Sequence, residues 1–298
     1  MDANRVLQFF EEHRQAGEPL VLATVVETSG STYSKTGEHM LIDAEGRFRG
    51  MLSGGCLEGD LAMRARVVIE SGEPQTVTYN LADGDEEVWG LGIGCDGEME
   101  ILLQLLDDSY EPFTSIAEIL CGEDAGIVTL DVGQDESLEF LLSPPPSVLI
   151  LGAGLDAEPL VRIASELGWR CTVVDHRPAY VNHGDFRTAR EKHCIPADQL
   201  ATSVKLSRFD MAVVMSHHLA SDRSYLRQLA ASDIGYVGLL GPAKRRKRLL
   251  EDLEKYADDL RERLHGPAGL SIGGRGANSI ALAIVAQMHA YYYGVPTS

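Results

Sequence analysis

The pattern of apolar and polar positions changes near the middle of the chain. In the second half, short apolar runs of strand length alternate with segments of helical spacing. The predicted strands are 148–151, 171–174, 211–215 and 236–240, and the predicted helices are 158–167, 225–231, 243–264 and 279–292. Strands that alternate with helices are joined by right-handed crossovers and build a parallel sheet covered on both faces. Residues 147–298 are therefore predicted to form a Rossmann-like, doubly wound α/β domain.

The first half lacks this alternation. Its predicted helices are 6–13 and 57–69, its predicted strands are 20–26, 76–79 and 99–105, and its predicted hairpin joins 40–42 to 47–51. This mixture predicts an α+β domain over residues 1–142. Residues 143–146, Ser-Pro-Pro-Pro, are interpreted as a stiff linker, because consecutive prolines cannot continue a helix or a central strand.

Charge and composition narrow the classes of function. The chain has 298 residues and a formal net charge of -19, which repels phosphate backbones and anionic lipid headgroups, so neither nucleic acid nor a membrane surface is an expected partner. No apolar run approaches the roughly 20 residues of a membrane span, and the polar N-terminus lacks the core of a signal peptide. A cytoplasmic protein is expected. The five cysteines contain no C-x-x-C pair and predict neither a disulfide framework nor a zinc knuckle.

A glycine motif opens the predicted Rossmann domain. Gly152-Ala153-Gly154 follows the first predicted strand and precedes the first predicted helix, and Asp175 ends the next strand. These are the positions at which a dinucleotide fold places its pyrophosphate turn and the acid that binds a ribose hydroxyl. Gly152, Gly154 and Asp175 are therefore candidate cofactor-binding residues for NAD(P) or another nucleotide. A Rossmann fold that holds no dinucleotide, or a different ligand, explains the motif equally well.

Polar residues elsewhere in this half have simpler interpretations. The histidine pair in Ser216-His217-His218 is expected to be solvated loop residues. The basic run from Lys244 to Arg248 is expected to form the exposed face of a helix, from which one side chain could reach an anionic ligand.

Two glycine-rich loops in the first half each carry one cysteine. Ser53-Gly54-Gly55-Cys56 leads into a predicted helix, where consecutive glycine amides can bind an anion and a thiol becomes a nucleophile or soft-metal ligand. Cys95 follows Gly94 in the second loop, residues 90–97. On the residues alone, an inert thiol at Cys56 and tight packing around Cys95 remain the simpler interpretations. Two such loops favour a common site.

These segments together resemble one family. Gly30-Ser31, residues 53–58 and residues 90–95 resemble the N-terminal signature of the XdhC/CoxI family. The second half continues the resemblance with residues 152–154, 173–178, 236–241 and 264–273.

The resemblance implies an accessory factor that binds molybdenum cofactor, supports its sulfuration or further maturation, and delivers it to a molybdenum hydroxylase such as xanthine dehydrogenase. It implies Cys56 and Cys95 as soft metal ligands or persulfide carriers, with Ser53, Gly54, Gly55 and Gly94 beside the cofactor. A homodimer and a cysteine desulfurase partner are further implications, and binding and hand-over are expected in place of turnover. The alternatives are an NAD(P)-dependent oxidoreductase and a non-catalytic nucleotide-binding or redox-sensing protein. The site is expected between the two domains.

Overall fold

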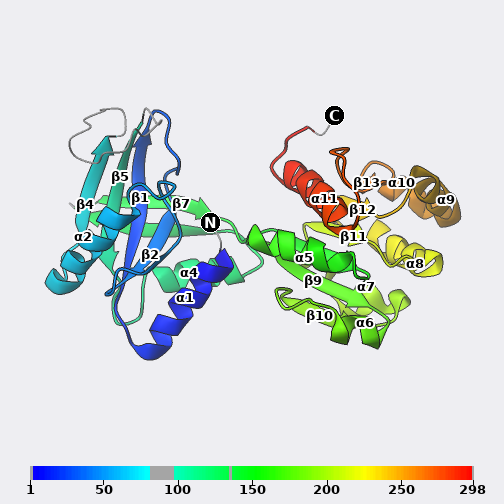
Figure 1. Ribbon diagram of the computed structural model, residues 1–298, viewed down its shortest axis with the longest axis horizontal. Coiled ribbons are helices and arrows are strands. Elements are labelled where there is room, and N and C mark those ends of the chain that lie inside the picture. Colours follow the sequence, from blue (N-terminus) through cyan, green and yellow to red (C-terminus); the bar gives the residue numbers. More distant parts are fainter. Residues whose placement is uncertain (1–2, 81–96, 134–135, 297–298) are drawn as a thin grey trace. The chain divides into compact units, whose positions relative to one another are not determined.

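The computed structural model describes residues 3–80, 97–133 and 136–296 (Figure 1). The chain divides into two compact units, Met1–Pro144 and Pro145–Ser298. The boundary falls within the proline segment 143–146.

The first unit is built on a five-stranded antiparallel sheet with the order β3-β2-β1-β5-β4. Its elements are α1 (Ala3–Ala16), β1 (Leu20–Ser29), β2 (His39–Asp43), β3 (Phe48–Arg49), α2 (Glu58–Ser71), β4 (Gln75–Asn80), β5 (Glu98–Leu105), α4 (Phe113–Cys121), β6 (Gly126–Gly133) and β7 (Glu136–Leu142). The hairpin predicted around residues 43–46 is present as β2 and β3.

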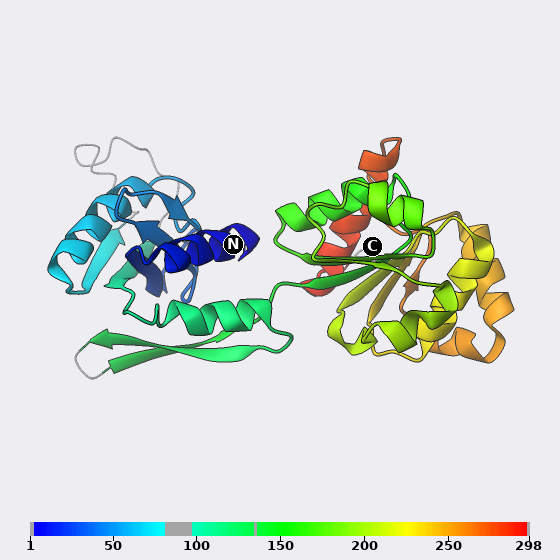
Figure 2. The same ribbon diagram turned by 90° about the horizontal axis from the view of Figure 1, so that it is seen from below.

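Both faces of this sheet are covered. On β1, Val21 and Ala23 point to the face that α2 covers, whereas Leu20 and Leu22 point to the face that α1 and α4 cover. This arrangement explains why β1 is a continuous apolar run, because a strand buried on both faces needs no polar alternation. The β6–β7 hairpin forms a separate two-stranded sheet beside α4 (Figure 2).

The second unit contains a six-stranded parallel sheet with the order β10-β9-β8-β11-β12-β13, which is the Rossmann strand order. Its elements are β8 (Ser147–Leu151), α5 (Ala157–Glu166), β9 (Arg170–Asp175), α6 (Pro178–His183), β10 (Glu191–Cys194), α7 (Leu200–Ser203), β11 (Met211–Val214), α8 (Leu219–Ala230), β12 (Tyr236–Leu239), α9 (Ala243–Leu253), α10 (Ala257–Leu260), β13 (Leu264–His265) and α11 (Ala277–Tyr292), with 3-10 turns at Ala197–Gln199, Leu206–Arg208 and Glu254–Tyr256.

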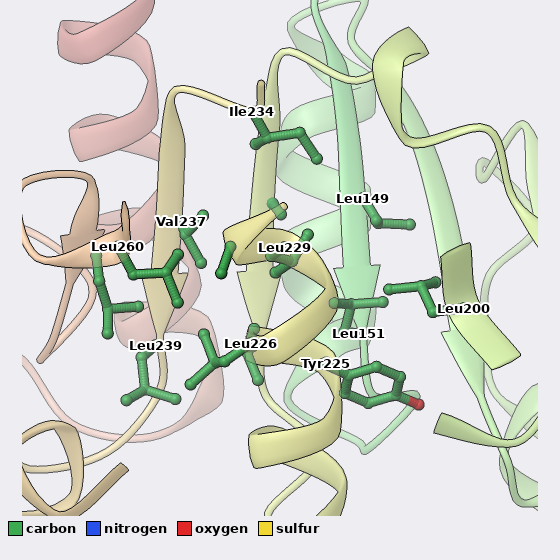
Figure 3. Packing of buried hydrophobic residues seen from close by; sticks show 14 of the residues in the cluster. Leu149, Leu151, Leu200, Tyr225, Leu226, Leu229, Ile234, Val237, Leu239 and Leu260 are labelled. Atoms are coloured by element: carbon green, nitrogen blue, oxygen red, sulfur yellow. The ribbon is translucent and has the colours of Figure 1, made fainter. Parts of the chain in front are cut away.

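Helices cover both faces of this sheet. α5, α6 and α11 pack on one face, and α7, α8, α9 and α10 pack on the other. Figure 3 shows the second face, where leucines of the strands meet Leu226 and Leu229 of α8. The predicted α/β fold, Rossmann-like in its second half and α+β in its first, is confirmed.

One predicted element is wrong. The spacing over 243–264 predicted a single long helix, but α9 ends at Leu253, where Glu254 takes a left-handed φ of 49°. A 3-10 turn and the short α10 follow, and Leu264 then pairs with Val237 as part of β13. The end of this segment pairs with the edge strand β12, and the spacing of apolar residues cannot predict a pairing with a strand far away in the sequence.

Candidate functional site

A buried carboxylate organises the loop that carries Cys56. Glu58, the first residue of α2, is 2% exposed. Its carboxylate accepts hydrogen bonds from the backbone N–H groups of Leu52 (2.8 Å), Ser53 (2.9 Å) and Gly55 (3.0 Å), and from the Ser53 hydroxyl (2.5 Å). The Ser53 hydroxyl in turn accepts the Leu57 N–H at 2.7 Å. One side chain therefore fixes the whole turn from residue 52 to residue 57.

The same contacts set the charge of Glu58. Burial acts to raise the pKa of this carboxyl, but the hydrogen bonds from Ser53 and the backbone amides outweigh it and hold the pKa below its ordinary value. Glu58 is thus an anion that occupies the turn from inside the protein. Of the two consecutive glycine amides that were expected to bind an anion, that of Gly55 donates to Glu58, as does the neighbouring Ser53 amide.

Cys56 itself is a free thiol of intermediate exposure, packed at the margin of the apolar cluster beneath α2. Its exposure lies between the burial assumed in the simpler interpretation and full exposure. The ring of Tyr33, 58% exposed, lies over Gly54, with its Cε2 atom 3.5 Å from the position that a Cβ of that glycine would take. The thiol therefore sits on a fixed turn beside an exposed aromatic ring.

The residues on either side of the second cysteine segment, Asn80 and Gly97, lie at one end of the antiparallel sheet. Gly97 packs closely against Ser29 and Ser31, since a Cβ at this position would lie only 2.6–2.7 Å from their carbonyl oxygens. Ser29 pairs with Glu98, which also pairs with Asn80 of β4. Cys95 and Gly94 lie outside the described residues, so the meeting of the two thiols, and with it their shared role as metal ligands, stays a prediction.

The predicted phosphate turn of the Rossmann unit is present, but groups of the protein surround it. Gly152 has a φ of 127°, and a Cβ there would lie 2.5 Å from the Met215 carbonyl oxygen, so this glycine serves the close approach of β8 to β11. Next to Gly154, Asp156 pairs with His217, with 2.7 Å between Oδ2 and Nε2. A negative side chain and an imidazole therefore flank the glycine that was predicted to approach a pyrophosphate.

Asp175 is also engaged within the protein. It is 1% exposed and accepts the Ala153 N–H at 2.8 Å, the Arg177 N–H at 2.9 Å, and two guanidinium contacts from Arg177 at 2.9 and 2.7 Å. Burial acts to raise the pKa of Asp175, but the hydrogen bonds from Arg177 and from the backbone amides have the larger effect. The pKa is therefore below its ordinary value, and the carboxylate stays ionised. Asp175 ties the glycine turn to β9, and a ribose hydroxyl would have to displace Arg177 to bind it.

Sequence reasoning missed a second set of polar residues at the carboxyl edge of this sheet. Asp222 of α8 is 1% exposed and accepts from Ser216 Oγ at 2.5 Å and from Arg245 at 3.1 and 2.5 Å. Tyr225 lies one turn further along α8 and is fully buried. Asp222 and Arg245 are 23 residues apart, and no local pattern links them.

Two interpretations of polar residues change with these contacts. Both histidines are exposed, as expected, but His217 also pairs with Asp156, and His218 caps α8 by accepting the Ser221 N–H. In the basic run, Arg245 turns inward to Asp222 and Arg246 donates to the Leu264 carbonyl.

Within residues 3–80, 97–133 and 136–296, no three His, Cys, Asp or Glu side chains gather as a metal site would require. No helix in these ranges combines the length and apolar character needed to cross a bilayer.

Comparisons with known proteins cover almost the whole chain. Residues 13–80 match the model of the XdhC and CoxI family, and residues 148–288 match the XdhC Rossmann domain. A protein of Bacillus subtilis (strain 168), named as a probable subunit of xanthine dehydrogenase, is 28% identical over 91% of this chain and 92% of its own. The "Molybdenum cofactor insertion chaperone PaoD" of Escherichia coli (strain K12) is 22% identical over 96% of this chain and 88% of its own.

A solved structure agrees with these matches. The crystal structure of a protein from Bacillus halodurans, described as a xanthine dehydrogenase, superposes with a TM-score of 0.81 and 30% identity, covering 97% of this chain and 96% of that one. The resemblance drawn from the cysteine loops and the glycine turn is thereby confirmed. The chain belongs to the XdhC and CoxI family.

Proposed function

We propose that this protein is an accessory factor that binds molybdenum cofactor and delivers it to a molybdenum hydroxylase of the xanthine dehydrogenase type. The observation that carries the proposal is the similarity, over nine-tenths of the chain, to a relative named as a molybdenum cofactor insertion chaperone and to one named as a probable subunit of xanthine dehydrogenase. The cofactor is cargo in this role, so the protein acts by binding and hand-over.

The geometry at Cys56 supports this role. A thiolate is a soft donor that suits molybdenum and sulfur chemistry. The Cys56 thiol is partly exposed, and Glu58 fixes the turn that carries it through four hydrogen bonds. A rigid turn lowers the entropy cost of placing a ligand group at the moment of binding. Cys95, the other thiol of this proposal, belongs to the glycine-rich segment 90–97 and lies outside the described residues.

The finer part of the proposal concerns sulfuration. The Cys56 thiolate would attack the outer sulfur of a persulfide on a cysteine desulfurase, forming a new S–S bond while the old one breaks and the desulfurase thiolate leaves. Cys56 would then carry the sulfur as a persulfide until the cofactor receives it. A homodimer is part of the same proposal.

The proposal is tested by co-elution of molybdenum cofactor with the purified full chain under anaerobic conditions, with molybdenum measured in the protein fraction. We expect the wild type to retain the cofactor, and Cys56→Ala and Cys95→Ala to lose most of it. Cys121→Ala is the matched control, because Cys121 is an exposed thiol of the same unit on α4, outside the loop. Wild-type protein that retains no cofactor would contradict the proposal.

The same preparation tests the oxidoreductase alternative. The contacts of Asp156 and Asp175 disfavour it, because a dinucleotide would have to displace the partners of both carboxylates. Reduction of NAD or NADP by the wild type with a small substrate, without cofactor retention, would establish the alternative.

A further inference from the structure

The hydroxyl of Tyr225 is buried without a hydrogen bond. Tyr225 is 0% exposed, and its hydroxyl has no partner among the described residues. Figure 3 shows the ring beside Leu151, near the end of β8, with the hydroxyl pointing away from the leucine side chains. A buried donor left unpaired costs about 1–3 kcal/mol, so native structures rarely keep one unless something else supplies the acceptor.

The groups around this hydroxyl do not supply that acceptor. Burial, followed by the negative charges of Asp175 and Asp222, raises the pKa of Tyr225 and keeps the phenol protonated. Yet the two carboxylates are already engaged, Asp175 by Arg177 and Asp222 by Ser216 and Arg245. The Tyr225 phenol is therefore an unpaired donor close enough to feel two carboxylates whose hydrogen bonds come from other groups.

Apart from the Asp156–His217 pair beside Gly154, the side chains named at this edge also have donors to offer. Arg177 and Arg245 each use Nε and one terminal nitrogen on a carboxylate, which leaves the other terminal nitrogen of each guanidinium as a donor. His218 Nδ1 accepts the Ser221 N–H at 3.3 Å, which requires the ring proton on Nε2. The His176 ring, 6.5 Å from the His218 ring, completes the set.

Exposure separates the charges at this edge. Asp175 and Asp222 are 1% exposed, whereas the side chains of Arg177 and Arg245 are 32% and 22% exposed. In a chain with a formal charge of -19, the Arg177 and Arg245 guanidinium groups are therefore more exposed than the carboxylates that they bind, and Asp156 beside them is paired with His217. Donors without acceptors suit a ligand with several anionic oxygens, and guanidinium groups bind phosphate well.

We propose that the carboxyl edge of the Rossmann sheet binds a phosphate monoester through Tyr225, His218, Arg177 and Arg245. This site lies at β9, β11 and the starts of α8 and α9, where ligands of open α/β sheets bind, and not on the glycine turn. The proposal goes beyond cofactor delivery and rests on its own observation, the unpaired phenol. The phosphate ester has two sources, the terminal phosphate of molybdenum cofactor and that of a free nucleotide.

The test titrates the full chain with inorganic phosphate and with AMP by calorimetry, at low ionic strength, with chloride at matched ionic strength as the control anion. We expect both probes to bind, and NAD, which lacks a monoester, to bind more weakly than AMP. Tyr225→Phe should weaken phosphate binding at least about tenfold, because it removes one hydrogen bond to a charged group. It should not destabilise the ligand-free protein, because the hydroxyl makes no bond in the fold.

Tyr236→Phe is the matched control. Tyr236 is equally buried in the same unit, but its hydroxyl donates to Gln287 Oε1 at 2.8 Å. This variant should lose stability and keep its affinity for phosphate. The absence of phosphate and AMP binding, or equal phosphate affinity of Tyr225→Phe and wild type, would overturn the proposal.

The same variant separates the two sources. A tenfold loss of molybdenum cofactor binding in Tyr225→Phe assigns the site to the cofactor, whereas unchanged cofactor binding with weakened AMP binding assigns it to a nucleotide. Because phosphate and AMP are tested without the cofactor, failure here is distinct from failure of cofactor retention at Cys56.

Discussion

Replacing Glu58 by glutamine tests whether one buried carboxylate holds the Cys56 turn. In the native protein one carboxylate oxygen accepts the amides of Leu52 and Ser53, and the other accepts the Gly55 amide and the Ser53 hydroxyl. Glutamine keeps one acceptor oxygen and replaces the other by an NH2 group. The Ser53 hydroxyl can rotate to accept from that group, but the Gly55 amide then faces a donor.

The magnitude follows from these four contacts. A hydrogen bond to a charged group contributes about 1.5–3 kcal/mol, and an amide left facing a donor adds a desolvation penalty. With the two contacts to the remaining oxygen weakened but kept, we expect a loss of about 2–4 kcal/mol in the unfolding free energy of the first unit. At about 1.4 kcal/mol per factor of ten, amide exchange in that unit should accelerate about 30- to 1,000-fold.

Hydrogen exchange by mass spectrometry on the full chain measures this loss unit by unit. Peptides from α2 and β1 should lose protection in Glu58→Gln, whereas peptides from β8 and β9 should not change. Glu70→Gln is the matched control, because Glu70 is an exposed residue of the same helix and its substitution should stay within about 0.5 kcal/mol.

The pH dependence provides a second check. The pKa of Glu58 is lower in the folded than in the unfolded protein, so its contribution is complete above the ordinary glutamate pKa and is lost as the pH falls below it. The difference between wild type and Glu58→Gln should therefore be constant near neutral pH and shrink below about pH 4.5. Protection within about 0.5 kcal/mol of wild type at about pH 7 would refute the reasoning.

Two further substitutions follow from the structure. Gly152→Ala should cost about 3–5 kcal/mol in urea unfolding, because a Cβ would lie 2.5 Å from the Met215 carbonyl oxygen and the residue has a φ of 127°. Gly154→Ala should cost under about 1.5 kcal/mol, because its one close contact is the Asp156 side chain and His217 lies at ordinary contact distance. Equal losses would contradict the assignment of Gly152 to the close approach of β8 and β11. Burial lowers the pKa of His39, so the unfolded state takes up the proton first and stability should fall by up to about 1.4 kcal/mol per pH unit below about pH 6.5. His39→Gln should flatten that slope, and an unchanged slope would show that another group causes it.

Regular patterns in the sequence predicted the fold class of the second unit and its four central strands, but not α6, β10, α7 or β13. The apolar runs at β8, β9, β11 and β12 lie buried on both faces, and glycine punctuation marked the end of α5. Among the elements that sequence reasoning missed, α4 has a clear apolar face at Phe113, Ile116 and Leu120, but several others have a weak pattern. β6 and β7 alternate with polar residues and leave Ile127 and Leu141 exposed, and β13 has only two residues. Their pairing depends on neighbours distant in the chain.

The sequence predicted the backbone turns of the candidate site, but not the side chains that bind to those turns. The glycine motifs identified the two turns, because positive φ angles demand glycine locally. What fills each turn was not evident, although Asp175-His176-Arg177 carried a signal, since an arginine two residues after the acid can reach it. No signal in the sequence predicted the contact between Asp222 and Arg245, because it forms only when α8 and α9 pack on the same face of the parallel sheet.

In both units, a carboxylate of the protein accepts hydrogen bonds from the backbone amides of a glycine-rich turn. In each, a glycine-rich turn presents backbone amides of the kind that bind anionic ligands, and in each a carboxylate of the chain itself accepts them: Glu58 at residues 52–55 and Asp175 at Ala153. An external phosphate at either turn would have to displace a buried carboxylate that is already well hydrogen-bonded. Ligand contacts are therefore expected from groups beside the turns that have no such partner. In the first unit this group is the Cys56 thiol, and in the second it is the Tyr225 hydroxyl.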